Sequence, residues 1–411
     1  MLQLVDVGVQ HLGRYRDAAG NDAVDELREL ARPLQGLRVL HLNATPYGGG
    51  VSELLRSVVP LLCDLGLATE WRVIAGEDEF FRATKWFHNA LQGAEGELTP
   101  EQREVYQRFS ERNARLLAAD YDIYVIHDPQ PAALRAMLPQ RGGRWVWRCH
   151  IDTSEPNPEV WGFLRPYLEP YDCWTFTMAE FAPPDLPQAK VKVIPPAIDP
   201  LSPKNIDLPD GVARGLLNWL GVHWERPMLT QVSRFDPWKD PLGAIAAYRL
   251  VKEEIPEVCL YLVGSMALDD PEGWEIYGQL MEARRGDPDL HVFSNFTGVS
   301  NIEVNAFQRL SDVIIQKSLR EGFGLVVSES LWKETPVVAG RTGGIPMQTG
   351  EGGYLVESVE ETAKWAAHLL RHPEEARERG RLGREGVRRN FLVTRMLRDS
   401  LRLFAGLLAA R

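Results

Sequence analysis

The sequence predicts an α/β protein built from two doubly wound domains. Short runs rich in β-branched and aromatic residues recur between longer segments in which apolar residues have helical spacing. Strands that alternate with helices form parallel sheets covered on both faces. A chain of 411 residues is too long for one core and suits two domains of roughly 200 residues each.

Five strands are predicted in each half of the chain. Those of the first half are LRVLHLN (37–43), WRVIA (71–75), YDIYVIH (121–127), RWVWRCH (144–150) and CWTFT (173–177). Those of the second half are PMLTQVS (227–233), VCLYLVG (258–264), LHVFS (290–294), DVIIQKS (312–318) and PVVAG (336–340). The alternation of Trp145 and Trp147 indicates packing within a strand more than a platform for a sugar.

The proline-rich segment VIPPAIDPLSPKNIDLPDG (193–211) is the expected domain boundary, since its prolines continue neither a sheet ladder nor a helix. We therefore predict an N-terminal domain over 1–195 and a C-terminal domain over 196–385. The last segment, about 386–411, is expected to form a helix that packs back on the first domain, with a solvated helix as the alternative.

Composition excludes several classes of partner. The formal net charge of −11 argues against a nucleic acid or an anionic membrane surface. The four cysteines are scattered without a CxxC pair, which favours a reducing cytoplasm. No apolar run approaches the roughly 18 residues of a membrane span, and the N-terminus has no signal-peptide pattern. A homodimer stays open as an alternative.

A run of three glycines follows the first long strand, in HLNATPYGGGVSELL (41–55). Gly48, Gly49 and Gly50 let the backbone approach a ligand closely. The N-terminus of the following helix adds free N–H groups, which favour an anion. A phosphate or sugar cradle and a simple tight turn are both compatible with this pattern, which matches neither GxGxxG nor GxxxxGK[ST].

Two cations stand at the end of a predicted strand in VSRFDPWKDP (232–241). Asp236 and Pro237 force a turn, so Arg234 and Lys239 can reach one cleft. This pair suits a diphosphate, with arginine as a planar fork and lysine as a point charge. The alternative is a surface loop in which the cations pair with Asp236 and Asp240.

Two glutamates flank a glycine turn in EGFGLVVSE (321–329). If a helix begins near Phe323 or Gly324, Glu321 lies just before its N-terminus and Glu329 lies in its second turn. Both carboxylates could then bind hydroxyls of one ligand while N–H groups of the turn face it. The plainer alternative is a loop entering a helix with both glutamates solvated.

These residues resemble a known family. EGFGLVVSE and RFDPWK are similar to the nucleotide-binding half of retaining GT-B glycosyltransferases related to glycogen and sucrose synthases. In the first half, YGGGVSELL, TKWFHNALQG, IHDPQPA and WRCHIDTSEPNPEVW resemble the trehalose glycosyltransferring synthases. The resemblance covers most of the chain apart from about 35 residues at its start and 30 at its end. It implies two Rossmann-like domains that face each other across a cleft.

The resemblance also implies roles for individual residues. The residues with the strongest chemical roles would be Arg234 and Lys239 on the diphosphate, Glu321 on the donor glucose and His150 beside that sugar. Further donor-binding residues would be Gly49, Gly50, Val51, Gly322, Phe323, Gly324, Leu325 and, on the ribose, Glu329. Residues expected near the sugars or in the acceptor pocket are Glu53, Trp86, His88, Asp128, Gln130 and Asp152. For His88 and His127, a histidine satisfied within a loop or core is the plainer alternative.

The reaction that the resemblance implies moves glucose from ADP-, UDP- or GDP-glucose to free glucose, giving trehalose with retention of configuration. The leaving phosphate would accept the proton of the acceptor hydroxyl, so no general acid is required. No DxD-like pair stands out at a strand end, so no protein-bound metal or other cofactor is expected, and Mg²⁺ could accompany the nucleotide. The sequence leaves open trehalose phosphorylase, a sugar-nucleotide epimerase and a non-catalytic nucleotide-sugar sensor. A dinucleotide-dependent oxidoreductase fits poorly because no GxGxxG follows a predicted strand.

Overall fold

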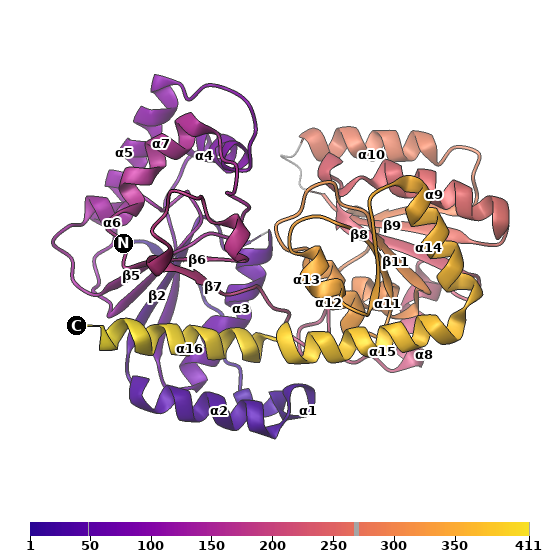
Figure 1. Cartoon of the computed structure of the whole chain (residues 1–411), viewed down its shortest axis with the longest axis horizontal. Coiled ribbons are helices and arrows are strands. Elements are labelled where there is room, and N and C mark those ends of the chain that lie inside the picture. The colour runs from indigo at the N-terminus through magenta and orange to yellow at the C-terminus, as the bar shows by residue number, and fades with distance from the viewer. Residues whose placement is uncertain (48, 267–270, 411) are drawn as a thin grey trace. The chain divides into compact units, whose positions relative to one another are not determined.

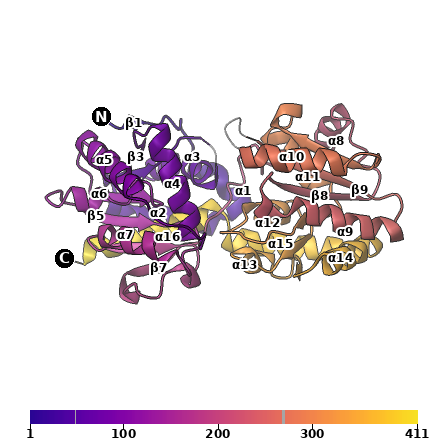
Figure 2. The same cartoon turned by 90° about the horizontal axis from the view of Figure 1, so that it is seen from above.

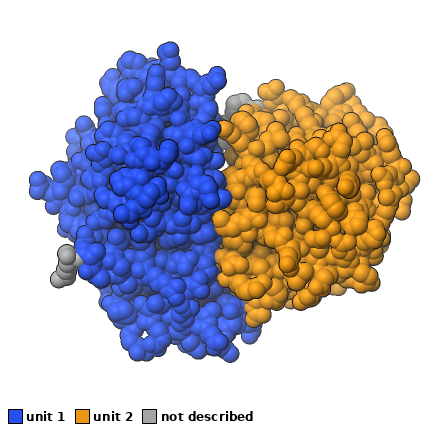
Figure 3. All heavy atoms as spheres, viewed as in Figure 1, with its two compact units in different colours: residues 1–196, 393–411 blue, residues 197–392 orange. Residues whose placement is uncertain are grey.

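The structure, a computed structural model, describes residues 1–47, 49–266 and 271–410. The chain divides into two compact units, which Figure 3 shows in different colours. Unit 1 comprises residues 1–196 together with 393–411, and unit 2 comprises residues 197–392. Each unit has its own sheet and its own core.

The strands of unit 1 are β1 (Gln3–Leu4), β2 (Arg38–Asn43), β3 (Ala68–Val73), β4 (Ile123–His127), β5 (Arg144–Arg148), β6 (Cys173–Phe176) and β7 (Val191–Val193). They form one sheet in the order β1-β3-β2-β4-β5-β6-β7. The short β1 pairs antiparallel with β3, and the other pairs are parallel.

The helices of unit 1 lie on both faces of this sheet (Figure 1). They are α1 (Arg16–Ala19), α2 (Asn21–Ala31), α3 (Gly49–Asp64), α4 (Asp78–Leu91), α5 (Pro100–Leu116), α6 (Leu134–Met137), α7 (Pro158–Leu168) and α16 (Val393–Ala409). Short 3₁₀ helices occur at Leu12–Tyr15, Arg32–Leu34, Ala179–Phe181 and Gln188–Lys190. The start of α5 shows the local logic, since Thr99 and Gln102 form a capping box around Pro100 at the first helical position.

One face of the unit 1 sheet packs against α4, α5 and α7 in a large apolar core. Trp145 and Trp147 are 0% and 1% exposed in that core, and the Trp145 ring stacks on Tyr124 with centroids 4.0 Å apart. The prediction that these tryptophans pack within a strand is confirmed. The opposite face carries α3 and α16, and α16 also packs against α2, where Arg402 pairs with Glu26 at 2.6 Å.

The strands of unit 2 are β8 (Met228–Arg234), β9 (Cys259–Ser265), β10 (Leu290–Ser294), β11 (Val313–Gln316), β12 (Val337–Gly340) and β13 (Gly353–Val356). They form a fully parallel sheet in the order β10-β9-β8-β11-β12-β13.

Helices cover both faces of this second sheet as well (Figure 2). They are α8 (Asp210–Trp219), α9 (Pro241–Glu254), α10 (Pro271–Ala283), α11 (Asn301–Leu310), α12 (Leu325–Trp332), α13 (Ile345–Thr349), α14 (Val359–Arg371) and α15 (Pro373–Asn390), with 3₁₀ turns at Pro237–Lys239 and Asn295–Thr297. One apolar cluster lies under α9, α10 and α14, and another lies under α8 and α11. None of the described helices is long and apolar enough to cross a membrane.

The predicted fold class, α/β with two doubly wound domains, is confirmed. All ten predicted strands are present, with ends that shift by at most three residues. Three strands were missed: β1 has only two residues, β7 has one lysine between two valines, and β13 begins with a glycine. Each is too short or too mixed for a period-two pattern to mark it.

The strand orders locate where a ligand should bind. In both sheets the first long strand lies between the second and a later strand, so the chain reverses its winding between β2 and β4 and between β8 and β11. Open parallel sheets bind ligands beyond the carboxyl ends of the strands at such switch points. The glycine run follows β2, the sequence HDPQ begins at the end of β4, Arg234 ends β8, and Glu321 follows β11.

Candidate active site

The glycine turn of unit 2 connects β11 to α12. The helix begins at Leu325, one residue after the predicted start, and Gly324 precedes it with φ of 81°. A Cβ at Gly324 would lie 3.1 Å from Glu321 Cγ and 3.2 Å from Ile345 Cγ1. Glycine is therefore required here by both backbone conformation and space, and the first N–H groups of α12 keep no partner inside the helix.

A second glycine pair, Gly343 and Gly344, supports this turn and was missed by the sequence analysis. Gly343 has φ of 51°, and a Cβ there would lie 1.7 Å from the carbonyl oxygen of Glu321. The N–H of Gly344 donates to the Gly322 carbonyl at 3.1 Å. The signal was a GG pair directly after a strand, the same kind of pattern as the glycine run of unit 1.

Lys239 and Glu321 form an ion pair, with Nζ 2.6 Å from Oε2. Their side chains are only 16% and 12% exposed, so the pair is largely shielded from water. The Ser318 hydroxyl donates to the same carboxylate oxygen at 3.4 Å. The two motifs, 82 residues apart in the chain, thus meet at the switch point of the sheet.

Arg234 is the last residue of β8, and its side chain is 64% exposed. Its Nη2 lies 3.1 Å from Asp236 Oδ2, as the surface-loop alternative anticipated. Pairs at exposed positions contribute only about 0–1 kcal/mol. The guanidinium therefore loses little if it exchanges this partner for a ligand.

The loop that carries Lys239 is fixed by Asp240, a contact that sequence reasoning missed. Asp240 has φ of 48° and caps α9 by accepting from the Gly243 N–H at 3.0 Å. Its other carboxylate oxygen is bound by Lys317 Nζ. Asp240 therefore pairs with Lys317, whereas the sequence analysis had considered a pair with Lys239.

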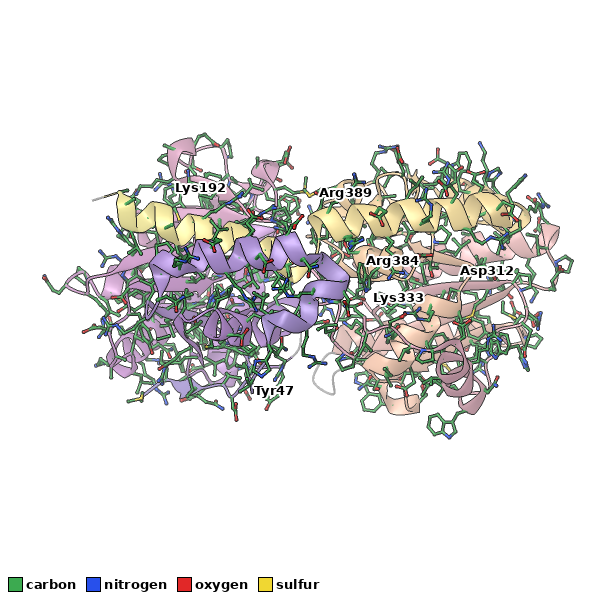
Figure 4. The ribbon with its side chains drawn as sticks, turned by 90° about the horizontal axis from the view of Figure 1, so that it is seen from below. Tyr47, Lys192, Asp312, Lys333, Arg384 and Arg389 are labelled. Carbon is green, nitrogen blue, oxygen red and sulfur yellow. The ribbon has the colours of Figure 1, made fainter. Side chains whose placement is uncertain are left out.

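Glu329 lies inside unit 2, with its residue 1% exposed. Gln308 Nε2 donates to its Oε2 at 3.0 Å, and Lys204 Nζ lies 3.4 Å from its Oε1. Lys333, labelled in Figure 4, donates to the Glu329 carbonyl at 2.9 Å and to Asn205 at 2.9 Å. Glu321 and Glu329 are thus both held by cations, and the solvated-loop alternative is wrong for both.

The glycine run of unit 1 leads into α3. Gly48 lies outside the described residues; Gly49 begins the helix with φ of 78°, and Gly49 and Gly50 are exposed. The Ser52 hydroxyl donates to the Thr45 carbonyl at 2.8 Å and fixes the approach to the helix. Tyr47, labelled in Figure 4, is 72% exposed beside this run. Val51 is half-buried, and Glu53 lies one turn further along α3.

Asp128, Gln130, His150 and Asp152 follow β4 and β5, which are neighbours in the sheet. Asp128 has φ of 63°, and its Oδ1 accepts from the His150 N–H at 2.9 Å. Burial raises the pKa of Asp128 to about 7. Asp152 accepts from the Ser154 N–H and hydroxyl at 3.0 and 2.6 Å. Four of the predicted positions therefore come from the carboxyl ends of two neighbouring strands.

His127 is buried and hydrogen-bonded to His41 and His150, as expected for a satisfied core histidine.

Trp86 and His88 lie on α4, two residues apart. The Trp86 ring contacts Phe87, and a Cβ on Gly96 would lie 3.3 Å from it. These contacts do not join Trp86 to the cluster around Asp128.

Two known families match the chain. The family described as trehalose synthase, N-terminal domain, matches residues 41–183, and glycosyl transferases group 1 matches residues 221–386. The chain is 55% identical to a trehalose synthase of Rubrobacter xylanophilus over 414 residues, covering 99% of this chain and 100% of that protein. It is 46% identical to a trehalose synthase of Thermococcus litoralis over 398 residues, covering 96% of each.

More distant relatives share the fold. A trehalose phosphorylase of Pleurotus pulmonarius is 29% identical over 88% of this chain and 56% of its own. A sucrose-phosphate synthase of Thermosynechococcus elongatus superposes with a TM-score of 0.68 at 19% identity, covering 91% of this chain and all of that one. A UDP-forming trehalose-phosphate synthase of Burkholderia xenovorans gives 0.69 at 18% identity, covering 90% and 100%. The fold class is GT-B, as predicted.

Proposed function

The chain belongs to the trehalose synthase family of glycosyltransferases, and on that premise we propose that it transfers glucose from a nucleoside diphosphate glucose to free glucose. The product is trehalose, and the reaction is reversible. The observation that carries the proposal is the shielded Lys239–Glu321 pair beside Arg234 at the switch point of unit 2.

Donor binding would exchange the partners of these groups. The diphosphate takes Lys239 and Arg234 from Glu321 and Asp236, because a dianion binds lysine and arginine more strongly than one carboxylate does. Glu321 is then free to accept hydrogen bonds from hydroxyls of the donor glucose. The N–H groups of Phe323, Gly324 and Leu325 lie at the N-terminus of α12, where negative charge is stabilised.

The remaining part of the donor would be held by α12 itself. Glu329 lies one turn into this helix, and it is buried. In the proposal its oxygens accept from the ribose hydroxyls, in addition to the bonds from Gln308 and Lys204. Gly322, in the same turn, would also contact the donor.

Unit 1 would supply the groups that meet the sugars. We assign Gly49, Gly50 and Val51 to the phosphate and donor glucose, and His150 and Asp152 to the orientation of the sugars. The acceptor glucose would be bound by Glu53, Trp86, His88, Asp128 and Gln130. No protein-bound metal or other cofactor belongs to this proposal, and Mg²⁺ carried by the nucleotide is compatible with it.

The transfer needs little acid–base help from the protein. The bond between glucose C1 and the β-phosphate oxygen breaks, and a bond from C1 to the acceptor hydroxyl oxygen forms on the same face. The proton of that hydroxyl moves to the departing phosphate, and configuration is retained. Arg234 and Lys239 stabilise the charge that grows on the phosphate, and electrostatic stabilisation of this kind usually contributes more to catalysis than any other single effect.

A phosphorylase is the second candidate, because relatives at 29% identity bear that name. It would use inorganic phosphate and form glucose 1-phosphate. Incubating the purified protein with trehalose plus phosphate, and separately with trehalose plus ADP, UDP or GDP, separates the two reactions.

The forward test uses ADP-, UDP- and GDP-glucose, each with and without glucose. We expect nucleoside diphosphate release that requires glucose, together with an α,α-linked disaccharide. Release that is independent of glucose, or glucose 1-phosphate from trehalose and phosphate, would overturn the proposal.

A further inference from the structure

Three histidines lie on one face of the unit 1 sheet, on neighbouring strands. His41 lies within β2, His127 ends β4 and His150 follows β5. In the parallel register His41 is level with Val125, and His127 is level with Arg148. Since side chains two residues apart share a face of a strand, the three imidazoles step diagonally toward the carboxyl ends of the strands.

The three imidazoles form a continuous hydrogen-bonded chain, called here the histidine chain. His41 Nδ1 lies 3.0 Å from His127 Nε2, and His127 Nδ1 lies 2.9 Å from His150 Nε2. At the inner end, His41 Nε2 is buried and has no hydrogen-bond partner among the residues that the structure describes. A buried nitrogen without a hydrogen-bond partner destabilises the fold. A small polar ligand at this end of the histidine chain would supply the missing hydrogen bond.

A cavity of about 30 Å³ adjoins the histidine chain. Its polar lining is formed by the three histidines with Arg148, Thr175 and Ser400, whereas the side chains that α3 contributes are all apolar. A cavity of this volume holds about two water molecules, and water is stable where several polar groups surround it. Water is therefore the ligand that fits His41 Nε2.

Arg148 is the charged group that lies with the histidines on this face. Its Nη2 donates to the Ile194 carbonyl at 3.1 Å and lies 3.8 Å from Met396 Sδ. Burial and then the Arg148 charge lower the pKa of His41 to about 3. Burial is also the main cause that lowers the pKa of His127 and His150 well below the ordinary range of imidazole.

Other charged groups near the histidine chain act mainly on Arg148. Asp128 accepts from the His150 N–H, and its charge favours the Arg148 cation. On α16, Arg395 and Asp399 form a pair at 2.9 Å, and their effects on the Arg148 pKa oppose each other. All three histidines therefore remain neutral near pH 7, with one N–H on each ring.

Three neutral imidazoles joined by two hydrogen bonds can donate in only two directions. The cavity at the inner end is lined by a donor-only cation, Arg148, and by the hydroxyls of Thr175 and Ser400, so a water held there can be directed to donate to His41 Nε2. We infer that the histidine chain donates outward, from His41 to His127 to His150, and presents the Nδ1–H of a neutral His150 to the ligand. His41 and His127 are positioning residues in this arrangement.

The consequence for the reaction rests on the proposed function. Glycosyl transfer develops positive charge at C1 of the donor sugar, and an imidazolium beside it would oppose that charge. A neutral His150 that donates through Nδ1 can bind a sugar hydroxyl without this penalty. No proton travels along the histidine chain; its hydrogen bonds only fix the tautomer and the charge of the last ring.

The direct test is ¹⁵N-histidine NMR on the ligand-free full chain, which needs no substrate. Two-bond couplings show which ring nitrogen carries the proton, and the variants below assign the signals. We expect His41, His127 and His150 to be protonated at Nδ1 only, from about pH 5 to 8. Protonation at Nε2 in these three rings, or an imidazolium signal near pH 6, would overturn the inference even if glucose transfer is found.

A kinetic test uses His41→Leu, with His291→Leu as a matched control. His291 lies in unit 2 and also has a buried Nε2 without a hydrogen-bond partner among the described residues. We expect kcat of His41→Leu to fall about tenfold, the upper value for loss of one hydrogen bond, because His127 is no longer held in one tautomer. The control should keep the wild-type kcat and pH profile.

His41→Asn provides the rescue, because its amide N–H can still donate toward His127. We expect it to restore most of kcat. Equal kcat and equal pH profiles for His41→Leu and His291→Leu would refute the positioning role. If His41→Leu does not fold, the tautomers of the wild-type chain still decide the question.

Discussion

The two switch points of this chain lie on similar sheets but differ in the charge of their side chains. At the carboxyl end of the unit 2 sheet, Lys239 and Arg234 are each paired with a carboxylate. At the corresponding end of the unit 1 sheet, the histidine chain is neutral and Asp128 has a pKa raised to about 7. One site stores its charges as ion pairs, and the other combines neutral imidazoles with a carboxyl group that titrates near neutral pH.

The difference follows from what each site is proposed to bind. A diphosphate carries charge into the site, so cations stored as ion pairs can exchange one anion for another at little cost. Glucose brings only hydroxyl groups, which neutral imidazoles and a carboxyl group can bind as hydrogen-bond donors and acceptors. The fold fixes where a ligand binds, whereas the burial and partners of a few side chains decide what charge it may bring.

The largest expected effect comes from removing the shielded cation of unit 2. Lys239→Ala should lower kcat by a hundredfold or more, on the order of 3 kcal/mol in the barrier, because the departing phosphate loses its point charge. Steady-state rates of nucleoside diphosphate release measure this effect. Lys364→Ala, at an exposed lysine of α14, is the control that should leave the rate unchanged.

Arg234→Ala sharpens the same comparison, since this cation is exposed before ligand binding and should leave stability unaltered. Urea unfolding should therefore give wild-type midpoints for Arg234→Ala while its rate falls nearly as far as that of Lys239→Ala. A rate close to wild type in either variant would contradict the diphosphate role.

The backbone of the glycine turn should give the next largest effect. Gly343→Ala places a Cβ 1.7 Å from the Glu321 carbonyl oxygen at a positive φ, so we expect a loss of about 2 kcal/mol in the free energy of unfolding. Urea denaturation followed by circular dichroism measures it. Gly211→Ala, in α8 with open space around its Cβ, should leave stability unchanged or raise it. If Gly343→Ala is as stable as wild type, the glycine turn can shift to accept the added methyl group.

The sequence predicted the unit 2 site more fully than the unit 1 site. Arg234, Lys239, Glu321 and Glu329 lie in two compact motifs whose residue types already indicate anion and hydroxyl binding. The ion pair between Lys239 and Glu321 could not be predicted, because it depends on β8 and β11 being neighbours. Sheet order is a property of the whole chain and not of a motif.

The histidine chain shows the same limit more sharply. His41 was interpreted only as part of a strand, and His127 only as a core or loop residue. Their relation appears once β2, β4 and β5 lie side by side in register. A histidine in each of three predicted strands, 37–43, 121–127 and 144–150, is a signal in the sequence that could have suggested it.

A fourth prediction concerns the ribose. Glu329→Gln should weaken binding of a nucleoside diphosphate glucose about tenfold, because a charge-assisted hydrogen bond becomes a neutral one. Glucose 1-phosphate lacks a ribose, so its affinity should be the same for both proteins. Isothermal titration calorimetry with the two ligands separates a ribose contact from a general disturbance of α12, which would weaken both.

The smallest expected effect is the pH dependence of glucose binding through Asp128. Its pKa is raised to about 7, first by burial, so it is mainly protonated at pH 6 and mainly ionised at pH 8. A carboxylate accepts hydrogen bonds more strongly than a neutral acid. The KM for glucose should therefore fall a few-fold between pH ~6 and ~8, whereas Asp128→Asn should show a flat profile.

The same titration sets the sign of a stability change that needs no substrate. The folded chain holds the Asp128 proton up to about pH 7, whereas the unfolded chain releases it near pH ~4. Stability is therefore lost as pH rises between these values and stays constant above pH ~7. Asp128→Asn removes this loss. The free energy of unfolding of the variant, measured in urea, should therefore exceed that of wild type by an amount that grows from pH ~4 to ~7. If the stability difference between Asp128→Asn and wild type does not change with pH, the pKa of Asp128 is not raised to about 7, and the proposed contrast between the two sheets is wrong.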